Sequence, residues 1–213
     1  MHFMQRSMPL RQKIDFGVLF FVIVAGAFAI NNAFTIGDWW HSLWYTPPPG
    51  MVALADGSGM NGKGKEYFYR FSPQYITAKS MEKKCGGIKL GCVEGSSIYI
   101  LVSDNSRAEF DRSVVTAAHE MLHVAYSRLS SSERQQLDNH LAIVLRKRSA
   151  MDIREILASY PRADYFNEAD SYVGTQMKDV GVWLNDYYSH YFSNRNKVVE
   201  AFFHSPEAVL VRD

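Results

Sequence analysis

The residues with the clearest chemistry lie at positions 116–125, where His119, Glu120 and His123 form the pattern H-E-x-x-H. On a helix, side chains four residues apart share nearly the same face, so the two histidines can present their imidazoles to one metal ion. Glu120 is turned by about 100° from His119 around the helix axis, which places it beside that ion. Two neutral nitrogen ligands and an adjacent carboxylate are the groups that zinc hydrolases use. The pattern predicts one bound Zn²⁺, with Glu120 as the general base.

The residues around this motif are typical of an active-site helix. Uncharged residues fill its free positions, apolar Val124 and Ala125 follow it, and no proline interrupts residues 116–125. The segment resembles the active-site helix of the zincin class of zinc metallopeptidases. The resemblance implies a zincin-like domain of gluzincin type that hydrolyses a peptide or protein substrate. The alternative is a helix with two unrelated core histidines and a chance glutamate.

The third metal ligand distinguishes the zincin subclasses. The metzincin pattern requires glycine and histidine soon after the motif, and residues 127–132 supply neither. In gluzincins whose third ligand is a glutamate about twenty residues after the motif, that position would fall at Leu141 or Ala142 here, and neither of these side chains binds a metal. The remaining pattern has its glutamate at the start of a later helix, and residues 167–172 resemble that element, with Glu168 as the ligand.

Other residues are candidates to support or replace Glu168. Asp170 is a candidate acceptor for the free N–H of one of the histidines, or an alternative ligand, as is Glu155. Ser171 and Thr175 share the helix face of Glu168 and are candidates to orient it. The chain departs from the family pattern four residues after Glu168, where Tyr172 replaces the expected acid.

The proposed reaction also needs a donor for the developing oxyanion and a surface that aligns the substrate. The candidate donors are Tyr172, His190, Tyr187, Tyr188 and His140. The β-branched, apolar run at residues 97–102 predicts a strand, expected to be an edge strand that binds an extended peptide by strand addition.

The first 36 residues predict a membrane anchor. Residues 1–13 contain three basic residues and no acid, and are expected to be cytoplasmic. Residues 14–36 approach the roughly 20 apolar residues that cross a bilayer. Aromatic residues at positions 39–45 resemble an interfacial belt, so the rest of the chain is expected to be extracytoplasmic. The alternative is a cleaved signal peptide and a secreted domain, because residues 27–29 resemble a cleavage site.

The remaining chain divides into a linker and a domain. Residues 37–66, rich in aromatics, proline and glycine, predict a linker, and residues 67–213 predict the peptidase domain. Cys85 and Cys92 flank a glycine-rich loop, and in an exported protein they are expected to form a disulfide; two free thiols are the alternative.

The expected fold class is α+β, mainly α, with a small N-terminal sheet followed by the motif helix and a helical C-terminal half. Besides the strand at 97–102, a strand is expected at 67–71. Helices are expected at about 107–129, 130–148, 152–160, 168–180, 182–192 and 196–203.

Composition narrows the function classes. The formal net charge is +1 and no basic stripe is interleaved with aromatic residues, so nothing indicates a nucleic-acid partner. Aromatic residues make up 14% of the chain, which favours a globular domain over disorder. The main alternative to an enzyme is an extracytoplasmic structural or binding module with a structural or vestigial zinc site.

Overall fold

The computed structural model describes residues 22, 24, 45–87, 89–101 and 106–206. The chain divides into two compact units, Met1–Trp44 and Tyr45–Asp213. In the first unit only Val22 and Val24 are described, so the predicted anchor at 14–36 lies otherwise outside the described residues, as do residues 1–13. Within the described part of the chain, no helix has both the length and the hydropathy to span a bilayer.

The second unit is mainly helical with one small sheet, as the sequence predicts. Its strands are β1 (Gln74–Ile76), β2 (Gly91–Glu94) and β3 (Ser97–Leu101). Its helices are α3 (Pro49–Gly57), α4 (Gly62–Arg70), α5 (Ala78–Cys85), α6 (Arg107–Ser127), α7 (Ser131–Val144), α8 (Met151–Leu157), α9 (Tyr165–Gln176), α10 (Val182–Ser189) and α11 (Asn196–His204), with a 3₁₀ turn at Arg148–Ala150.

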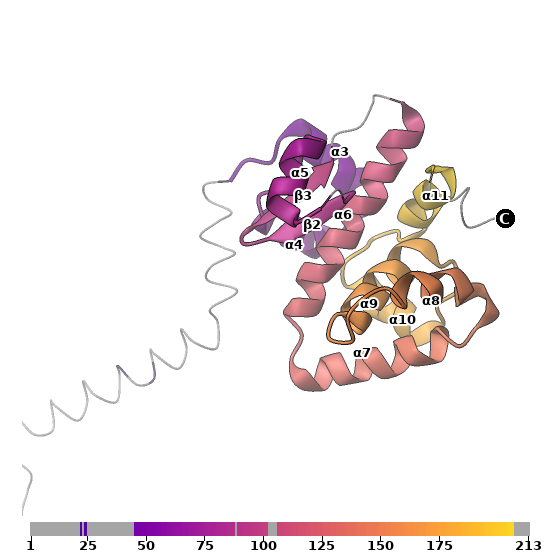
Figure 1. Cartoon of the computed structure of the whole chain (residues 1–213). Helices are drawn as coiled ribbons and strands as arrows, with labels where there is room; N and C mark the ends of the chain where they lie inside the picture. The colour runs from indigo at the N-terminus through magenta and orange to yellow at the C-terminus, as the bar shows by residue number, and fades with distance from the viewer. Residues whose placement is uncertain (1–21, 23, 25–44, 88, 102–105, 207–213) are drawn as a thin grey trace, which may run out of the picture. The chain divides into compact units, whose positions relative to one another are not determined.

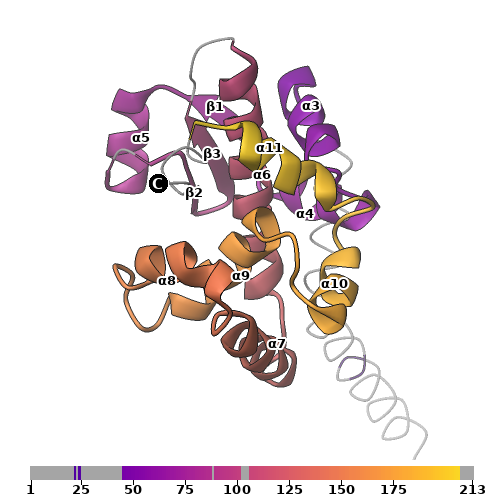
Figure 2. The same ribbon diagram turned by 90° about the vertical axis from the view of Figure 1, so that its right-hand side faces the viewer.

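Helix α6, which carries the H-E-x-x-H motif, is the centre of this unit. It packs against the sheet, α3, α4, α9 and α11. The sheet lies on one side of it and α7, α8 and α9 on the other (Figures 1 and 2). Ala117, Ala118 and Ala125 are fully buried, and these small side chains let neighbouring elements approach the helix closely. The predicted N-terminus is confirmed, because Ser106 Oγ accepts a hydrogen bond from Glu109 N at 3.3 Å.

The three strands have the order β1-β3-β2, with β1 parallel and β2 antiparallel to β3. The strand predicted at 97–102 is confirmed as β3. The prediction that it is an edge strand is wrong, because β3 pairs on both sides and buries Ile98 and Ile100. An unbroken apolar run is typical of a strand covered by its neighbours. The edge strand beside α6 is β2, which the sequence did not predict.

Two predictions for the start of this unit are wrong. The predicted linker at 37–66 contains α3 and the start of α4, separated by residues 58–61, while its residues 37–44 lie outside the described part of the chain. The predicted strand at 67–71 belongs mostly to α4. Proline is favourable in the first turn of a helix, since its missing N–H would have no partner there. Met51 and Leu54 are then buried one turn apart, so this segment is part of the core. The compact unit begins at Tyr45.

The glycines and aromatic residues of α4 explain why the sequence predicts a linker and a strand where the structure has a helix. A Cβ on Gly64 would lie 2.3 Å from Tyr191 O, so this glycine permits a close approach and does not indicate a mobile loop. Asn61 Oδ1 accepts a hydrogen bond from Gly64 N at 3.0 Å and caps the helix. Phe68, one turn later, is fully buried.

The remaining helices occur near their expected positions but with shifted ends. The capping box of Ser130 and Glu133 at the start of α7 is confirmed. Helix α7 ends at Val144, before residue 148, and α9 spans Tyr165–Gln176 and not 168–180. Gly181 immediately precedes α10. Glu168 N bonds to Asp164 O at 2.9 Å, so the candidate ligand still lies near the N-terminus of α9.

Candidate metal centre

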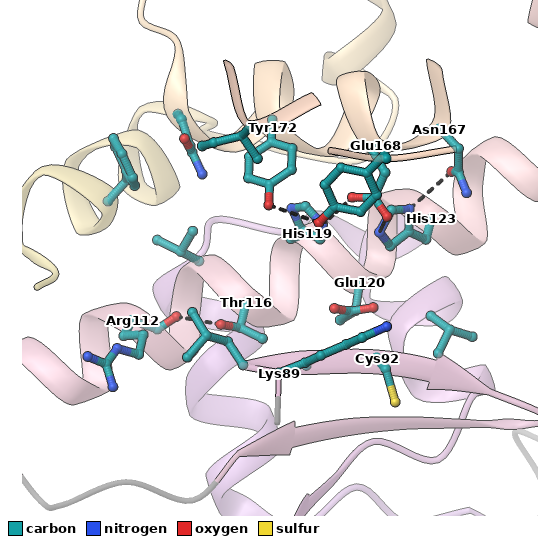
Figure 3. Close-up of a pocket in the computed structure, with 18 of the residues that line it drawn as sticks. Lys89, Cys92, Arg112, Thr116, His119, Glu120, His123, Asn167, Glu168 and Tyr172 are labelled. Carbon is teal, nitrogen blue, oxygen red and sulfur yellow. Dashed lines mark hydrogen bonds and ion pairs between the residues drawn. The ribbon is translucent and has the colours of Figure 1, made fainter. Parts of the chain in front are cut away.

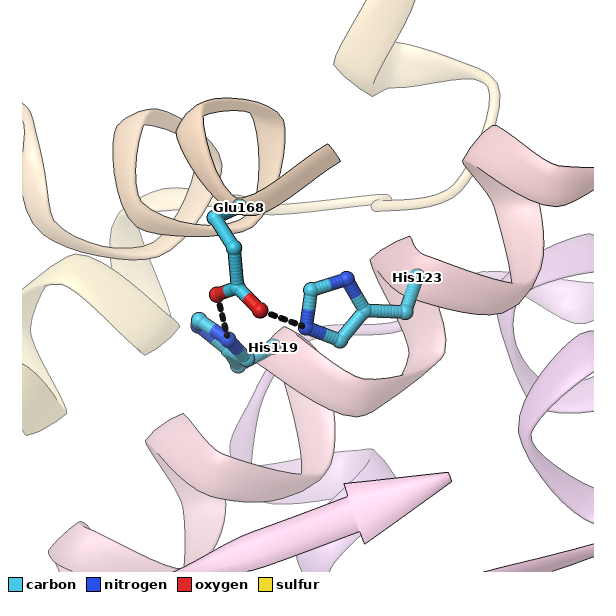
Figure 4. Close-up of side chains that lie close together, drawn as sticks. All are labelled: His119, His123 and Glu168. Carbon is cyan, nitrogen blue, oxygen red and sulfur yellow. Dashed lines mark ion pairs between the residues drawn. The ribbon is translucent and has the colours of Figure 1, made fainter. Parts of the chain in front are cut away.

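Three side chains from two helices meet beside α6. His119 and His123 project from α6 toward Glu168 of α9 (Figure 4). His119 Nε2 lies 3.4 Å from Glu168 Oε2, and His123 Nε2 lies 3.6 Å from Glu168 Oε1. The possible ligand atoms of the three residues all lie within 4.8 Å of one another. All three side chains are at most 15% exposed.

The second nitrogen of His123 has partners that define its tautomer. His123 Nδ1 lies 3.0 Å from Asn167 Oδ1 and 3.2 Å from Ser171 Oγ. The amide oxygen of Asn167 can only accept, so Nδ1 carries the proton and donates it. Burial, followed by the neighbouring His119, lowers the pKa of His123 to about 4, so the ring is neutral at pH 7. Its Nε2 therefore presents a lone pair to Glu168.

This arrangement is unfavourable for Glu168 unless a cation lies between the groups. Burial opposes ionisation of Glu168, and the imidazoles of His119 and His123 lower the pKa of the carboxyl through the hydrogen bond and the charge that they supply when protonated. At pH 7 the neutral His123 supplies neither. Glu168 Oε2 is buried and has no hydrogen-bond partner among the described residues. A carboxylate oxygen facing a nitrogen lone pair is a contact of two acceptors, which a metal ion would convert into two favourable bonds.

The separations also fit a metal ion. They exceed the 2.7–3.2 Å typical of a hydrogen bond between nitrogen and oxygen. Two atoms that each coordinate a tetrahedral ion at about 2.1 Å lie about 3.4 Å apart. His119, His123 and Glu168 could therefore hold a metal ion, as their donor atoms and spacing indicate.

Glu120 lies next to this group on α6. Its side chain is 5% exposed, and it lines the same cavity as the two histidines. Burial raises the pKa of Glu120 to about 7, although the neighbouring His119 opposes the shift. A carboxyl group with a pKa near 7 can both accept and return a proton at neutral pH, as a general base requires.

The edge strand β2 passes directly over Glu120. A Cβ added to Gly91 would lie 2.8 Å from Glu120 Oε1 and 2.5 Å from Thr116 Cγ2. The chain therefore has glycine where the strand backbone meets the carboxylate. Lys89, just before β2, extends its side chain toward Glu120 (Figure 3).

The group opens into a cavity of about 790 Å³ between the sheet, α6, α8, α9 and α11. Residues 89–93 form its wall on the sheet side, and Tyr160 and Tyr172 line it on the helical side. Tyr172 lies edge-on to His119, with ring centroids 4.8 Å apart, and its Oη lies 3.2 Å from Tyr160 Oη (Figure 3). Burial raises the pKa of both tyrosines, so both hydroxyls keep their protons.

The other candidate oxyanion donors lie elsewhere. His190 is exposed, and its Nδ1 contacts the backbone oxygens of its own helix. His140 stacks on Trp183, with centroids 4.1 Å apart. Tyr187 and Tyr188 donate hydrogen bonds to Asp170. The structure therefore brings only Tyr172 of these candidates to the cavity.

Several roles predicted around Glu168 need correction. Asp170 is fully buried and accepts hydrogen bonds from two tyrosines of α10, not from a histidine, and burial raises its pKa to about 7. Ser171 contacts the imidazole of His123 and not Glu168. Thr175 Oγ1 donates to Ser171 O at 2.7 Å. The physical reason is that α9 packs on α6 and receives the side chains of Tyr187 and Tyr188 from α10, so that Asp170 meets these tyrosines and Ser171 meets His123.

Neither alternative metal ligand belongs to the group. Asp170 accepts hydrogen bonds from the tyrosines, and Glu155 of α8 lines the cavity outside the three-residue group.

The predicted disulfide is present: the structure joins Cys85 at the end of α5 to Cys92 of β2, with Cα atoms 6.2 Å apart. The bridge holds the loop before β2, and Cys92 itself lines the cavity.

Sequence reasoning missed Asn167, Tyr160 and Gly91 as parts of this site. The signal available for Asn167 is its position next to Glu168 near the start of α9. No local pattern marks Tyr160 or Gly91, because both reach the site through contacts between distant elements.

In comparisons with known proteins, no protein family, no curated protein and no solved structure matches the chain.

Proposed function

We propose that this chain is a zinc-dependent endopeptidase, anchored in a membrane by residues 14–36 and active outside the cytoplasm. One observation carries the proposal: the Glu168 carboxylate faces the Nε2 atoms of His119 and His123, with Glu120 beside them in one cavity. Two imidazoles and one carboxylate form the ligand set of zinc hydrolases that keep an open position. The H-E-x-x-H resemblance to zincins supports the same assignment.

The residues of the chain would divide the reaction between them. Zinc, when bound to this set, supplies a Lewis acid that lowers the pKa of water to about 7. Glu120 accepts the proton of the attacking water on its carboxylate and returns it to the leaving amine. Asn167 holds His123 in the tautomer with a free Nε2 lone pair.

The outer edge of β2, which pairs with no other strand of the described residues, suits a peptide substrate. β2 is at the end of the sheet, and its residues line the cavity that contains Glu120. An extended peptide could pair with this edge as an additional strand, with alternate side chains directed into the cavity. A peptide held there would place its backbone carbonyl groups near the candidate catalytic residues.

The direct test is hydrolysis of a denatured protein by the purified full-length chain. The proposal predicts cleavage that a zinc chelator stops and that added Zn²⁺ restores. Peptide mapping by mass spectrometry would identify the new termini. Bound metal without any cleavage would contradict the peptidase assignment and favour a binding module with a structural metal.

Replacing Gly91 by alanine is predicted to lower kcat/KM by about 10- to 100-fold, because the added methyl group displaces the Glu120 carboxylate or Thr116. Gly87→Ala, in the loop that leads into β2, is the matched control, since its Cβ would meet no atom within 4 Å. Steady-state kinetics on one peptide compare the two variants. Equal activities would show that β2 does not constrain Glu120.

The acidic residues on the α8 side of the cavity predict a preference for cationic side chains there, whereas Lys89 lines it on the sheet side and Arg112 on α6. Asp152 and Glu155 of α8 and Asp164 line it together. A peptide with lysine or arginine on the α8 side would gain about two- to five-fold in kcat/KM for each carboxylate it approaches. Cleavage of a random peptide library, read by mass spectrometry, should show enrichment of basic residues that is weaker in the double variant D152N/E155Q, which keeps only Asp164 of the three carboxylates. The same enrichment in both proteins would contradict this preference.

A further inference from the structure

The candidate metal site is divided between two helices. Helix α6 carries both imidazoles, whereas α9 carries Glu168. A site of three ligands works only when its side chains are held within about 0.5 Å of the required geometry. Whatever fixes α9 relative to α6 therefore decides whether the third ligand is in place.

The site itself does not hold Glu168. Its Oε2 has no hydrogen-bond partner among the described residues, and its Oε1 faces the lone pair of His123 Nε2. Without a metal ion, the contact of Oε1 with the His123 lone pair is unfavourable, and the contact of Oε2 with His119 Nε2, at 3.4 Å, is long for a hydrogen bond. The position of α9 must be fixed by contacts elsewhere on that helix.

Asp170 makes such contacts on another face of α9. Two residues beyond Glu168, it is turned by about 200° around the helix axis. Its side chain is fully buried. Tyr188 Oη lies 3.0 Å from Asp170 Oδ1 and 3.1 Å from the Asp170 backbone oxygen, and Tyr187 Oη donates to Oδ2 at 3.3 Å. The hydroxyl of Tyr188 thus binds both the side chain and the backbone of α9.

The ring of Tyr188 also packs directly on the backbone of α9. A Cβ added to Gly174 would lie 2.8 Å from Tyr188 Cε1 and 2.5 Å from Leu122 Cδ1 of α6. Glycine at this position lets α9, α6 and the tyrosine ring meet without a gap. Tyr188 therefore fixes α9 both by packing and by hydrogen bonds.

Arg195 secures the C-terminal end of the same helix. Its Nη1 donates to Met177 O at 2.7 Å and to Gly174 O at 3.2 Å, and its Nη2 donates to Lys178 O at 2.9 Å. The guanidinium lies 5.5 Å from the centre of the Tyr188 ring. Tyr188 therefore constrains α9 at Asp170, and Arg195 constrains the last turn of the same helix.

A buried carboxylate is a costly way to pack two helices, since apolar side chains of similar volume usually stabilise a core as well or better. What Asp170 adds is direction, because its hydrogen bonds tolerate little sliding or rotation of α9. We propose that Asp170 and Tyr188 are positioning residues: their hydrogen bonds hold α9 where Glu168 can share a metal ion with His119 and His123. This inference rests on the metal site of the proposed function and is independent of peptide hydrolysis.

The test compares the full-length chain with its Tyr188→Phe variant, which keeps the ring and removes the hydroxyl. Zinc affinity is measured by competition with a chromogenic chelator, and the absorption spectrum with Co²⁺ reports the coordination geometry. The expected result is a 10- to 100-fold loss of zinc affinity, the range typical of residues that orient metal ligands, with a changed Co²⁺ spectrum. Tyr187→Phe, which removes the longer hydrogen bond, is expected to lose less.

Tyr126→Phe is the matched control. Tyr126 Oη also donates to a carboxylate, Asp138 Oδ1, at 2.9 Å, but this bond links α6 to α7. Unfolding in chelator measures how much stability each variant loses without metal. The proposal requires that Tyr126→Phe keep the wild-type zinc affinity and Co²⁺ spectrum even where its stability loss equals that of Tyr188→Phe.

The outcomes separate this inference from the peptidase proposal. Wild-type affinity in Tyr188→Phe, or an equal affinity loss in Tyr126→Phe, would overturn the positioning role. Should Tyr188→Phe not fold, unchanged affinity in Tyr187→Phe would overturn it as well. A wild-type chain that binds zinc and cuts no peptide would contradict only the peptidase, whereas one that binds no zinc would overturn both.

Discussion

Glu120→Gln is expected to lower kcat by about 10²- to 10⁴-fold while the metal content of the chain stays at the wild-type level. Glutamine keeps the shape of the side chain, which is 5% exposed and touches Gly91. It removes the carboxylate that would accept the proton of water. Steady-state kinetics and metal analysis of the same preparation measure the two effects.

The two measurements together distinguish a general base from a structural residue. Loss of both metal and activity would show that Glu120 maintains the site and does not act on the substrate. Activity that survives with metal bound would contradict the proposed mechanism, because the other carboxylate next to the histidines, Glu168, would be occupied as a ligand.

Glu168→Gln is expected to weaken zinc binding by more than about 100-fold, beyond the range typical of residues that only orient ligands. The variant should also be more stable than wild type in the absence of metal, by about 1 kcal/mol. The reason is that an amide N–H can donate to the lone pair of His123 Nε2, whereas the carboxylate oxygen at 3.6 Å cannot. Chelator competition gives the affinity, and urea unfolding gives the stability.

Glu168→Gln, expected to be the more stable protein without metal, should therefore become the less stable one when zinc is added. Zinc at 100 times its Kd would stabilise the wild type by about 2.7 kcal/mol and the variant far less. Glu155→Gln is the matched control, because Glu155 lines the same cavity but lies outside the three-residue group. A variant at position 168 that binds zinc normally, or an affinity loss confined to position 155, would refute the ligand assignment.

The parts of the site that could be predicted depend on local periodicity. His119, Glu120 and His123 lie on one helix, and the geometry of a helix determines how side chains four residues apart are related. The mainly helical fold with one small sheet follows from the same patterns, as do the capped starts of α6 and α7. Glu168 was identified by resemblance to zincins, because it lies 45 positions after His123 and no local pattern relates the two.

The parts that could not be predicted depend on contacts between distant elements. Gly91 looks like one more loop glycine until β2 is seen against Glu120, and Asp170 faces α10 because of how α9 packs. Gly64 belongs to the predicted linker at 37–66 because a sequence does not show that another backbone lies against this glycine. The strand at residues 97–102 was identified correctly, but its position in the sheet depends on partners that only the fold supplies.

The central claim is that His119, His123 and Glu168 hold one metal ion. The most direct measurement is the metal content of the purified full-length chain by inductively coupled plasma mass spectrometry. The account predicts one zinc per wild-type chain and almost none in the folded double variant H119A/H123A. A wild-type chain without metal, or a double variant that keeps its zinc, would contradict it.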